Sequence, residues 1–103
     1  MKFARYFAHG EIAYGVVDGD MVRQITTSPF ESFEVTDHMH PQDHVQILSP
    51  IVPGKILAMA LNYGSHLGEN ERPKQPEPFW KNPSSVIANG EPILLPKDAG
   101  KVD

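Results

Sequence analysis

Prolines and glycines punctuate this chain along its whole length, and they set the strongest limit on its fold. Ten prolines and eight glycines occur among 103 residues, which is more than ordinary usage. Proline lacks a backbone donor and glycine weakens regular elements, so such frequent interruption favours short strands and turns over long helices. We therefore expect an α+β fold that is mostly β, with a core of modest size.

Charge and cysteine content exclude several classes of function. The formal net charge is −4, and residues 24–54 contain acidic residues but no lysine or arginine. Binding to phosphate groups needs clustered cations, so we expect neither nucleic acid nor a membrane surface as a partner. Without cysteine, neither disulfides nor thiolate metal sites can form. We expect no signal peptide and a cytoplasmic location.

Alternating patterns in residues 1–50 predict a small N-terminal β unit. Lys2–Ala8 is predicted to be a strand, followed by a turn at His9-Gly10 and a second alternating segment. The pair Asp18-Gly19 favours a type I′ hairpin that leads into a third strand, Met21–Ile25. The result would be an antiparallel meander whose apolar face packs on the rest of the protein.

Turn and proline signals separate this meander from a second unit. Ser28 as a cap followed by proline predicts one or two helical turns over Phe30–Val35. Pro50 and Pro53 then favour an extended connector, because proline also pushes the preceding residue out of the helical region. We therefore place the second unit at residues 51–103.

Three histidines precede the connector. His38, His40 and His44 have a spacing that occurs in some imidazole metal sites. Pro41 interrupts the regular spacing, so we favour a polar surface loop here. The alternative is weak binding of a transition metal without a catalytic role.

The centre of the second unit is a strand that runs directly into reactive side chains. Ile56–Leu61 is too short for a membrane span and is predicted to be a buried strand. Asn62 is a good helix cap, so we predict a short helix from Tyr63 to about Arg72, which must end before Pro73.

His66 and Glu69 lie three residues apart in this segment and would share one face of such a helix. A carboxylate can fix an imidazole tautomer and stabilise the imidazolium, so the pair could act as an oriented base. The alternative is two solvated surface side chains. Gly64 and Gly68 weaken the helix, and the segment could instead be a loop with one turn.

A proline-rich stretch and short elements follow. Residues 72–78 are predicted to be an extended loop of the kind that skirts a site or a neighbouring subunit. A short strand begins at Phe79-Trp80-Lys81, and Lys81 could hold a substrate carboxylate, the alternative being an exposed lysine at a strand end. Asn82–Ser85 predicts a turn, and Pro92–Pro96 a strand bracketed by prolines.

Three ordered blocks span nearly the whole chain: MKFARY, ILSPIVPGKILAMALNYGSHLGE, and PFWKNPSSVI followed by EPILLP. Together they resemble the fumarylacetoacetate hydrolase family, in its bacterial type with a small N-terminal unit. Ala60 departs from the pattern, which usually has glycine just before L-N-Y, and its methyl group could crowd a close backbone contact. The resemblance implies the first strands and one short helix of that family's mixed β fold.

The resemblance also implies a metal-dependent hydrolase, decarboxylase or isomerase of small dicarbonyl acids. In such enzymes a divalent ion, Mg²⁺ or Mn²⁺, chelates the keto and carboxylate oxygens of the substrate. By the same resemblance, His66 and Glu69 are the catalytic dyad, Asn62 and Tyr63 shape the pocket, and Lys81 is a substrate contact. Members of the family commonly pair as homodimers.

The family's metal ligands are expected to lie outside this sequence. They are carboxylates that follow a segment like V-D-Y-E-x-E-L, which would begin at Val102-Asp103. We expect no E-x-E pair, and hence no complete Mg²⁺ site, within the 103 residues. The chain would then be an N-terminal portion of a longer enzyme, inactive alone. The alternative is a non-catalytic β-rich module that docks on a partner, and the reading frame beyond Asp103 would distinguish the two.

Overall fold

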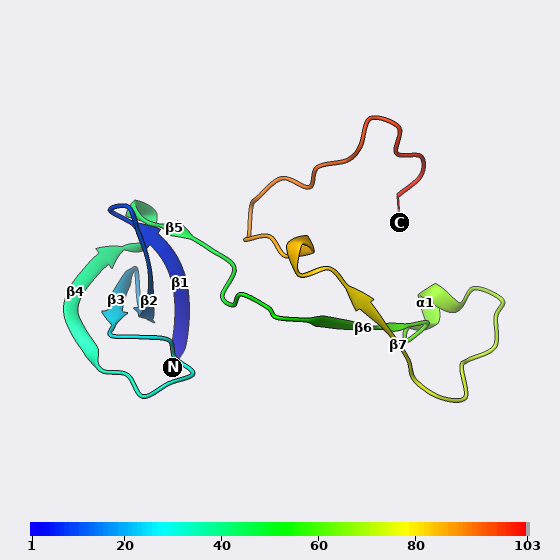
Figure 1. The fold of residues 1–103 in the computed structure, drawn as a ribbon, viewed down its shortest axis with the longest axis horizontal. Coiled ribbons are helices and arrows are strands. Elements are labelled where there is room, and N and C mark those ends of the chain that lie inside the picture. Colours follow the sequence, from blue (N-terminus) through cyan, green and yellow to red (C-terminus); the bar gives the residue numbers. More distant parts are fainter. Residues whose placement is uncertain (103) are drawn as a thin grey trace. The chain divides into compact units, whose positions relative to one another are not determined.

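The computed structural model describes residues 1–102 and consists mostly of strands, turns and extended segments (Figure 1). The predicted mostly β class is confirmed. Contacts divide the chain into two compact units: Met1–Pro50 with the segment from Ile87 onward, and Ile51–Val86. That last segment, which we had predicted to belong to the second unit, therefore groups by contacts with the first.

The first unit is a five-stranded sheet in which every pairing is antiparallel. Its strands are β1 (Lys2–Ala8), β2 (Glu11–Asp18), β3 (Met21–Ile25), β4 (Val35–Pro41) and β5 (Gln46–Ile47), with a 3-10 turn η1 (Gln42–His44) before β5. The strand order β4-β3-β2-β1-β5 makes β1 to β4 a meander, while β5 returns to the other edge of β1. The predicted meander is therefore confirmed and extended by two strands.

Two tight turns connect the first three strands. His9 and Gly10 join β1 to β2, and both have positive φ, 50° and 83°, as a type I′ turn requires. Between β2 and β3, Asp18 pairs with Met21, so the two turn residues are Gly19 and Asp20 rather than Asp18 and Gly19. Only Gly19 has positive φ there, which matches the type II′ pattern with glycine first. The hairpin was predicted correctly, but its turn type was wrong.

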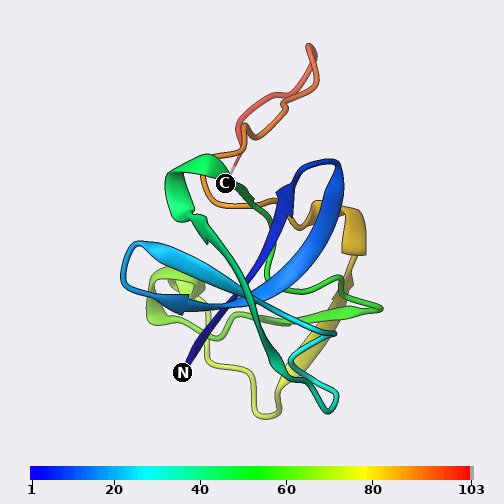
Figure 2. The ribbon, with the colours of Figure 1, turned by 90° about the vertical axis from the view of Figure 1, so that its left-hand side faces the viewer.

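The core of the first unit is small. Tyr6 and Val22 are completely buried, and Ala4 packs with them. Along β1, Ala4 and Tyr6 face inward while Phe3 and Phe7 stay partly exposed, because successive strand residues face opposite sides. The sheet curls (Figure 2), and the Tyr6 ring on β1 meets the His40 ring on β4 with centroids 5.8 Å apart. Strands that are not neighbours in the sheet thus share one core.

Gly15 on β2 allows this close packing. A Cβ atom at this position would lie 2.5 Å from Val22 Cγ1 and 2.7 Å from the Arg23 carbonyl oxygen. Real side chains do not approach that closely, so any larger residue would push β3 away from β2. The glycine is needed here for space.

The predictions for residues 26–44 are wrong in two places. Phe30–Val35 is not helical: the chain turns as Glu31 N donates to Ser28 O over 3.1 Å, and Val35 already pairs with Ile25 at the start of β4. The segment expected to be a polar loop is largely strand β4, in which His40 lies opposite Val22. Pairing with β3 outweighs the weak helical preference of so short a segment.

The second unit is an antiparallel hairpin of β6 (Ile56–Ala60) and β7 (Glu77–Lys81). Between the two strands lies a single helical turn, α1 (Gly64–Leu67), followed by the proline-rich stretch. After β7 comes η2 (Pro83–Ser85), whose cap Asn82 accepts a hydrogen bond from Ser84 N through Oδ1 at 3.2 Å. Both predicted strands and the turn after them are confirmed.

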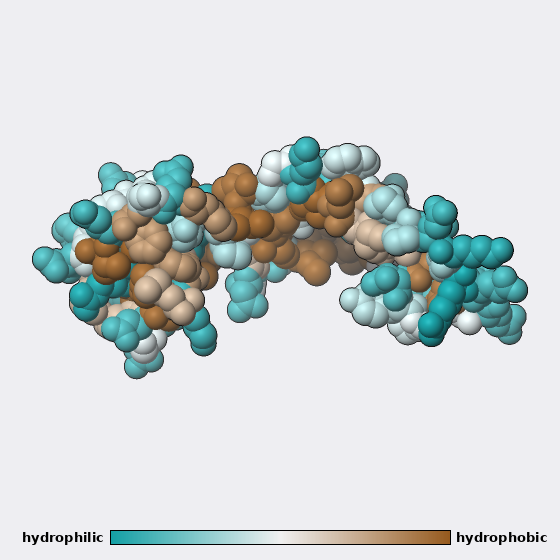
Figure 3. All heavy atoms as spheres, turned by 90° about the horizontal axis from the view of Figure 1, so that it is seen from below, coloured by the Kyte–Doolittle hydropathy of each residue, from teal (hydrophilic) through white to brown (hydrophobic). Residues whose placement is uncertain are grey.

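Burial of β6 was predicted and is wrong for the described chain. Leu57 and Trp80 face each other across the hairpin yet are 57% and 68% exposed. Two strands form only one ladder, and they leave both faces open to solvent unless further elements cover them. Figure 3 shows polar residues gathered over the end of this unit that carries α1.

The last described segment is also not a strand where one was predicted. Pro92–Pro96 forms no ladder within residues 1–102, and Ile93 and Leu94 are 79% and 87% exposed. Its bracketing prolines cannot donate to a neighbouring strand. Within the same residues, the structure has no helix with the length and apolar character that crossing a bilayer requires.

Candidate functional site

The exit of β6 positions the candidate site. The strand ends at Ala60, and Leu61 takes a positive φ of 48°, which redirects the chain. This conformation costs a non-glycine residue roughly 1–2 kcal/mol, so the surrounding structure must impose it. Asn62 follows, but it is not the helix cap that we predicted: Tyr63 is the cap residue of α1, and no side-chain cap hydrogen bond forms there.

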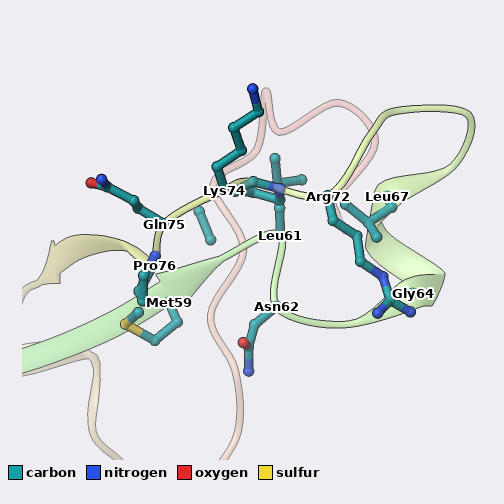
Figure 4. Close-up of a pocket in the computed structure, with 11 residues that line it drawn as sticks. Met59, Leu61, Asn62, Gly64, Leu67, Arg72, Lys74, Gln75 and Pro76 are labelled. Atoms are coloured by element: carbon teal, nitrogen blue, oxygen red, sulfur yellow. The ribbon is translucent and has the colours of Figure 1, made fainter.

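A pocket of about 420 Å³ opens at this exit, within the second unit. Its walls come from the end of β6, from α1 and from the proline-rich stretch (Figure 4). Leu61 and Leu67 give it apolar surface, and Asn62 gives it an amide. Leu67 is the buried residue of α1, so its packing fixes the helical turn against the pocket.

Two cations line the same pocket, Arg72 and Lys74. All the lining residues are described, and none of them is acidic. In Figure 4, Arg72 extends toward the start of α1 whereas Lys74 points the other way. Guanidinium and ammonium groups both form charge-assisted hydrogen bonds with carboxylates, so a pocket with two cations and no acidic residue in its lining favours anions. We had predicted a loop that skirts a site here, but had given its cations no role. The available signal was a pair of cations on either side of Pro73.

His66 and Glu69 lie close in sequence but not on one helical face. His66 is on α1, and its ring makes an edge contact with Tyr63, centroids 6.0 Å apart. α1 ends at Gly68, whose φ of 56° and ψ of −122° turn the chain before Glu69. The predicted helix from Tyr63 to about Arg72 is therefore wrong, and the alternative of a loop with one turn is confirmed.

The structure does not join the two side chains. His66 and Glu69 are exposed, and among residues 1–102 no ion pair is recorded between them. Neither they nor Tyr63 belongs to the residues lining the pocket, although the neighbouring Asn62 and Gly64 do. The catalytic role of His66 and Glu69 therefore stays a prediction. Residues next to His66 in the sequence line the pocket, but His66 and Glu69 do not.

Lys81 lies at the opposite end of the hairpin. It pairs with Ile56, whereas Ala60 at the pocket pairs with Glu77. Four residues of strand correspond to about 13 Å, more than one side chain spans. In this structure Lys81 therefore does not share the pocket with Asn62.

The described residues do not fit a Mg²⁺ or Mn²⁺ site. Such hard cations take several oxygen ligands, yet residues 1–102 contain no group of three or more histidine or acidic side chains placed to hold an ion. Glu69 and Glu71 do have the E-x-E spacing, contrary to our expectation of no such pair, but both are exposed. Asp103, where the ligand segment was expected to begin, lies outside the described residues.

Family models cover nearly the whole chain in two parts. Residues 1–50 match the model described as Rv2993c-like, N-terminal, and residues 55–103 match Fumarylacetoacetate (FAA) hydrolase C-terminal. Together with the mostly β fold, these matches correspond to an amino-terminal portion of the two-part architecture that the two models describe. The chain belongs to the fumarylacetoacetate hydrolase family, as the motifs predicted.

Individual proteins are also similar to this chain over most of its length. An uncharacterized protein of Archaeoglobus fulgidus is 35% identical over 103 residues, which are 96% of this chain and 37% of the relative. Oxaloacetate tautomerase fahd2, mitochondrial, of Xenopus laevis is 31% identical over 88 residues, covering 82% of this chain and 27% of the relative.

Solved structures confirm the fold. The crystal structure of 5-carboxymethyl-2-hydroxymuconate delta-isomerase from Mycobacterium smegmatis matches with a TM-score of 0.80 and 29% identity, over 96% of this chain and 40% of that one. The chain spans less than half the length of each of these relatives. It therefore carries part of the family's fold.

Proposed function

We propose that this chain supplies part of the active site of a metal-dependent enzyme that acts on small dicarbonyl acids, with isomerisation as its reaction. The observation that carries this proposal is the cationic pocket at the exit of β6. The names of two relatives, a tautomerase and a delta-isomerase, support isomerisation over the hydrolysis and decarboxylation that the family resemblance also allows.

The pocket's chemistry suits a dicarbonyl acid. Arg72 and Lys74 offer charge-assisted hydrogen bonds to carboxylates, and the Asn62 amide can donate to a keto oxygen. Leu61 and Leu67 complement the carbon chain between these polar groups. Two anion-binding groups beside an apolar wall support this substrate class.

Isomerisation between keto and enol forms moves one proton from carbon to oxygen. Imidazole exchanges protons near neutral pH, so His66 would take or return this proton, and Glu69 would orient the imidazole. The two side chains are not paired in the structure, so this role requires the turn at Gly68 to rearrange when substrate binds. A short, glycine-bounded turn is suited to such movement.

The proposed enzyme also needs groups that residues 1–102 do not provide. The ligands of its Mg²⁺ or Mn²⁺ ion would come from further polypeptide, where the bound ion would polarise the substrate carbonyl. We propose that the 103-residue chain is inactive alone and that the complete enzyme is a homodimer. Relatives more than twice as long leave room for these ligands.

The test compares two proteins: the 103-residue chain and the product of its complete reading frame, each with Mg²⁺ and oxaloacetate, followed by enol absorbance. We expect turnover only in the longer protein, with kcat lowered about 10²–10⁴-fold by His66→Ala. Arg72→Ala should raise KM more than it lowers kcat, because it removes binding. Lys55→Ala is the matched control, an exposed cation before β6 that does not line the pocket.

Two outcomes would contradict the proposal. Robust turnover by the 103-residue chain, abolished by His66→Ala, would show that no further polypeptide is needed. An unchanged kcat for His66→Ala in an active longer protein would show that His66 and Glu69 do not act as the catalytic dyad.

A second candidate is a non-catalytic β-rich module that docks on a partner. The exposed hairpin favours it, because Leu57 and Trp80 present apolar surface that a partner could cover. A reading frame that stops at Asp103, with no turnover by its product, would favour the module over the enzyme.

A further inference from the structure

Two histidines of the first unit come together away from the candidate site. His9 is in the turn between β1 and β2, and His40 is on β4. Their ring centroids are 5.4 Å apart, with 44° between the ring planes. The sequence spacing had linked His40 with His38 and His44 instead. The fold replaces that grouping with a pair drawn from distant parts of the unit.

The fold positions the backbone of both residues and packs the His40 ring. His40 lies opposite the fully buried Val22 on β3, and its ring packs edge-on against Tyr6. His9 is held by a two-residue turn in which its own φ is 50°. The same aromatic cluster contains a buried polar atom without a hydrogen-bond partner, the Tyr6 hydroxyl oxygen. The cluster is therefore polar, partly shielded and not satisfied by its own contacts.

Two imidazoles at this separation fit one metal ion. Histidine nitrogen binds Zn²⁺ at about 2.0–2.1 Å, so two rings on one tetrahedral ion have centroids roughly 5 Å apart. The observed 5.4 Å is close to that value. Imidazole is a ligand for Zn²⁺, Ni²⁺ and Cu²⁺ rather than for Mg²⁺, so this chemistry is distinct from that of the proposed enzyme site.

We propose that His9 and His40 together bind one divalent transition-metal ion, with water completing its coordination. No third histidine or acidic side chain joins them within residues 1–102, so the site is open and of moderate affinity. A bound ion would link the β1–β2 turn to β4, two elements that are not neighbours in the sheet. It would therefore stabilise the curl of the first unit.

The experiment titrates the untagged chain with Zn²⁺ and follows the imidazole resonances by NMR, together with the thermal midpoint. We expect the resonances of His9 and His40 to shift together at one equivalent, with a rise in the midpoint. His9→Asn keeps a residue that tolerates positive φ, and His40→Phe keeps a ring against Tyr6. Each should weaken Zn²⁺ binding at least 10-fold and reduce the rise in midpoint.

His38→Asn and His44→Asn are matched controls, since both residues are exposed histidines of the same region. They should leave the affinity unchanged. Equal midpoints of all variants in the presence of chelator would show that the substitutions do not disturb the fold. Zn²⁺ affinity that survives His9→Asn or His40→Phe, an equal loss in the controls, or no binding at millimolar Zn²⁺ would overturn the proposal.

Discussion

Tyr6 makes two opposite contributions to the stability of the first unit, one from its ring and one from its hydroxyl. It is one of the two largest fully buried side chains, yet its hydroxyl has no hydrogen-bond partner. Burial raises the pKa of this hydroxyl above its usual value, because the phenolate would lose its hydration. A buried, unpaired hydroxyl costs about 1–3 kcal/mol. The aromatic ring therefore stabilises the core while its polar atom opposes it.

Replacing Tyr6 with phenylalanine should stabilise the chain. Tyr6→Phe removes the unpaired hydroxyl and keeps the ring, so the free energy of unfolding should rise by about 1 kcal/mol at pH 7. Because burial raises the pKa of Tyr6, deprotonation favours the unfolded chain, so the free energy of unfolding is unaffected below about pH 10 and falls as the pH rises further. The variant should lose less stability between pH 9 and 11 in urea unfolding. A less stable variant at pH 7 would show that the hydroxyl has a partner in solution.

At the scale of elements, α1 shows how one glycine shapes the candidate site. Gly68 ends the helix in a conformation open in practice only to glycine, and Asn70 N then donates to Leu67 O over 2.8 Å. This hydrogen bond closes the turn between His66 and Glu69. The geometry of the proposed dyad therefore depends on backbone conformation rather than on helical spacing.

Gly68→Ala should open this turn. A Cβ at φ 56° and ψ −122° is strained by roughly 1–3 kcal/mol, so the Asn70 amide should exchange with solvent at least 10-fold faster. Hydrogen exchange measured by NMR provides the readout. Gly54→Ala is the control, because Gly54 has ordinary φ and open space around its Cα. Unchanged exchange at Asn70 would mean that the turn does not depend on Gly68.

Local signals in the sequence predicted local structure well. The turn at His9-Gly10, the strands β1 and β3 and the strand β6 each follow from a few adjacent residues. β4 was missed because its stability comes from pairing with β3, which no local pattern reveals. The apolar run of β6 predicted a buried strand, but burial depends on which elements cover a strand, and Leu57 is exposed here.

The candidate site was predictable only in part. Its location at the exit of β6 followed from the order of motifs, and Asn62 does line the pocket. The roles of Arg72 and Lys74, and the meeting of His9 with His40, arise from how distant segments fold together. The sequence therefore indicated the region in which this pocket lies, but not most of the side chains that line it.

At the scale of the whole molecule, the two units differ in the number of packed elements that stabilise them. The first has five strands around a shared core, whereas the second has a two-stranded hairpin and one helical turn. Two strands alone are marginally stable in water. We therefore expect the second unit to depend on further elements of the family fold for its order, or to self-associate through its apolar surface.

Hydrogen exchange should reveal this difference. Amides of β6 and β7 should exchange at least 100-fold faster than those of β1 to β3 in the 103-residue chain, because few contacts oppose local opening. In the product of a longer reading frame the same amides should become protected. Mass spectrometry of peptides from residues 56–60 and 2–8 gives the comparison, at two protein concentrations to detect self-association. Equal protection in the short chain would show that the hairpin is stable without additional polypeptide.

The strand order of the first unit bears on how it folds. β1, β2 and β3 each pair with the next strand in sequence, so hairpins of low contact order can form one after another as the chain leaves the ribosome. Only β5 must close a long loop to reach β1, through two residue pairs. We expect the pairing of β5 with β1 to form last during folding and to break first during unfolding. The connector to the second unit would then stay unanchored until the meander is complete.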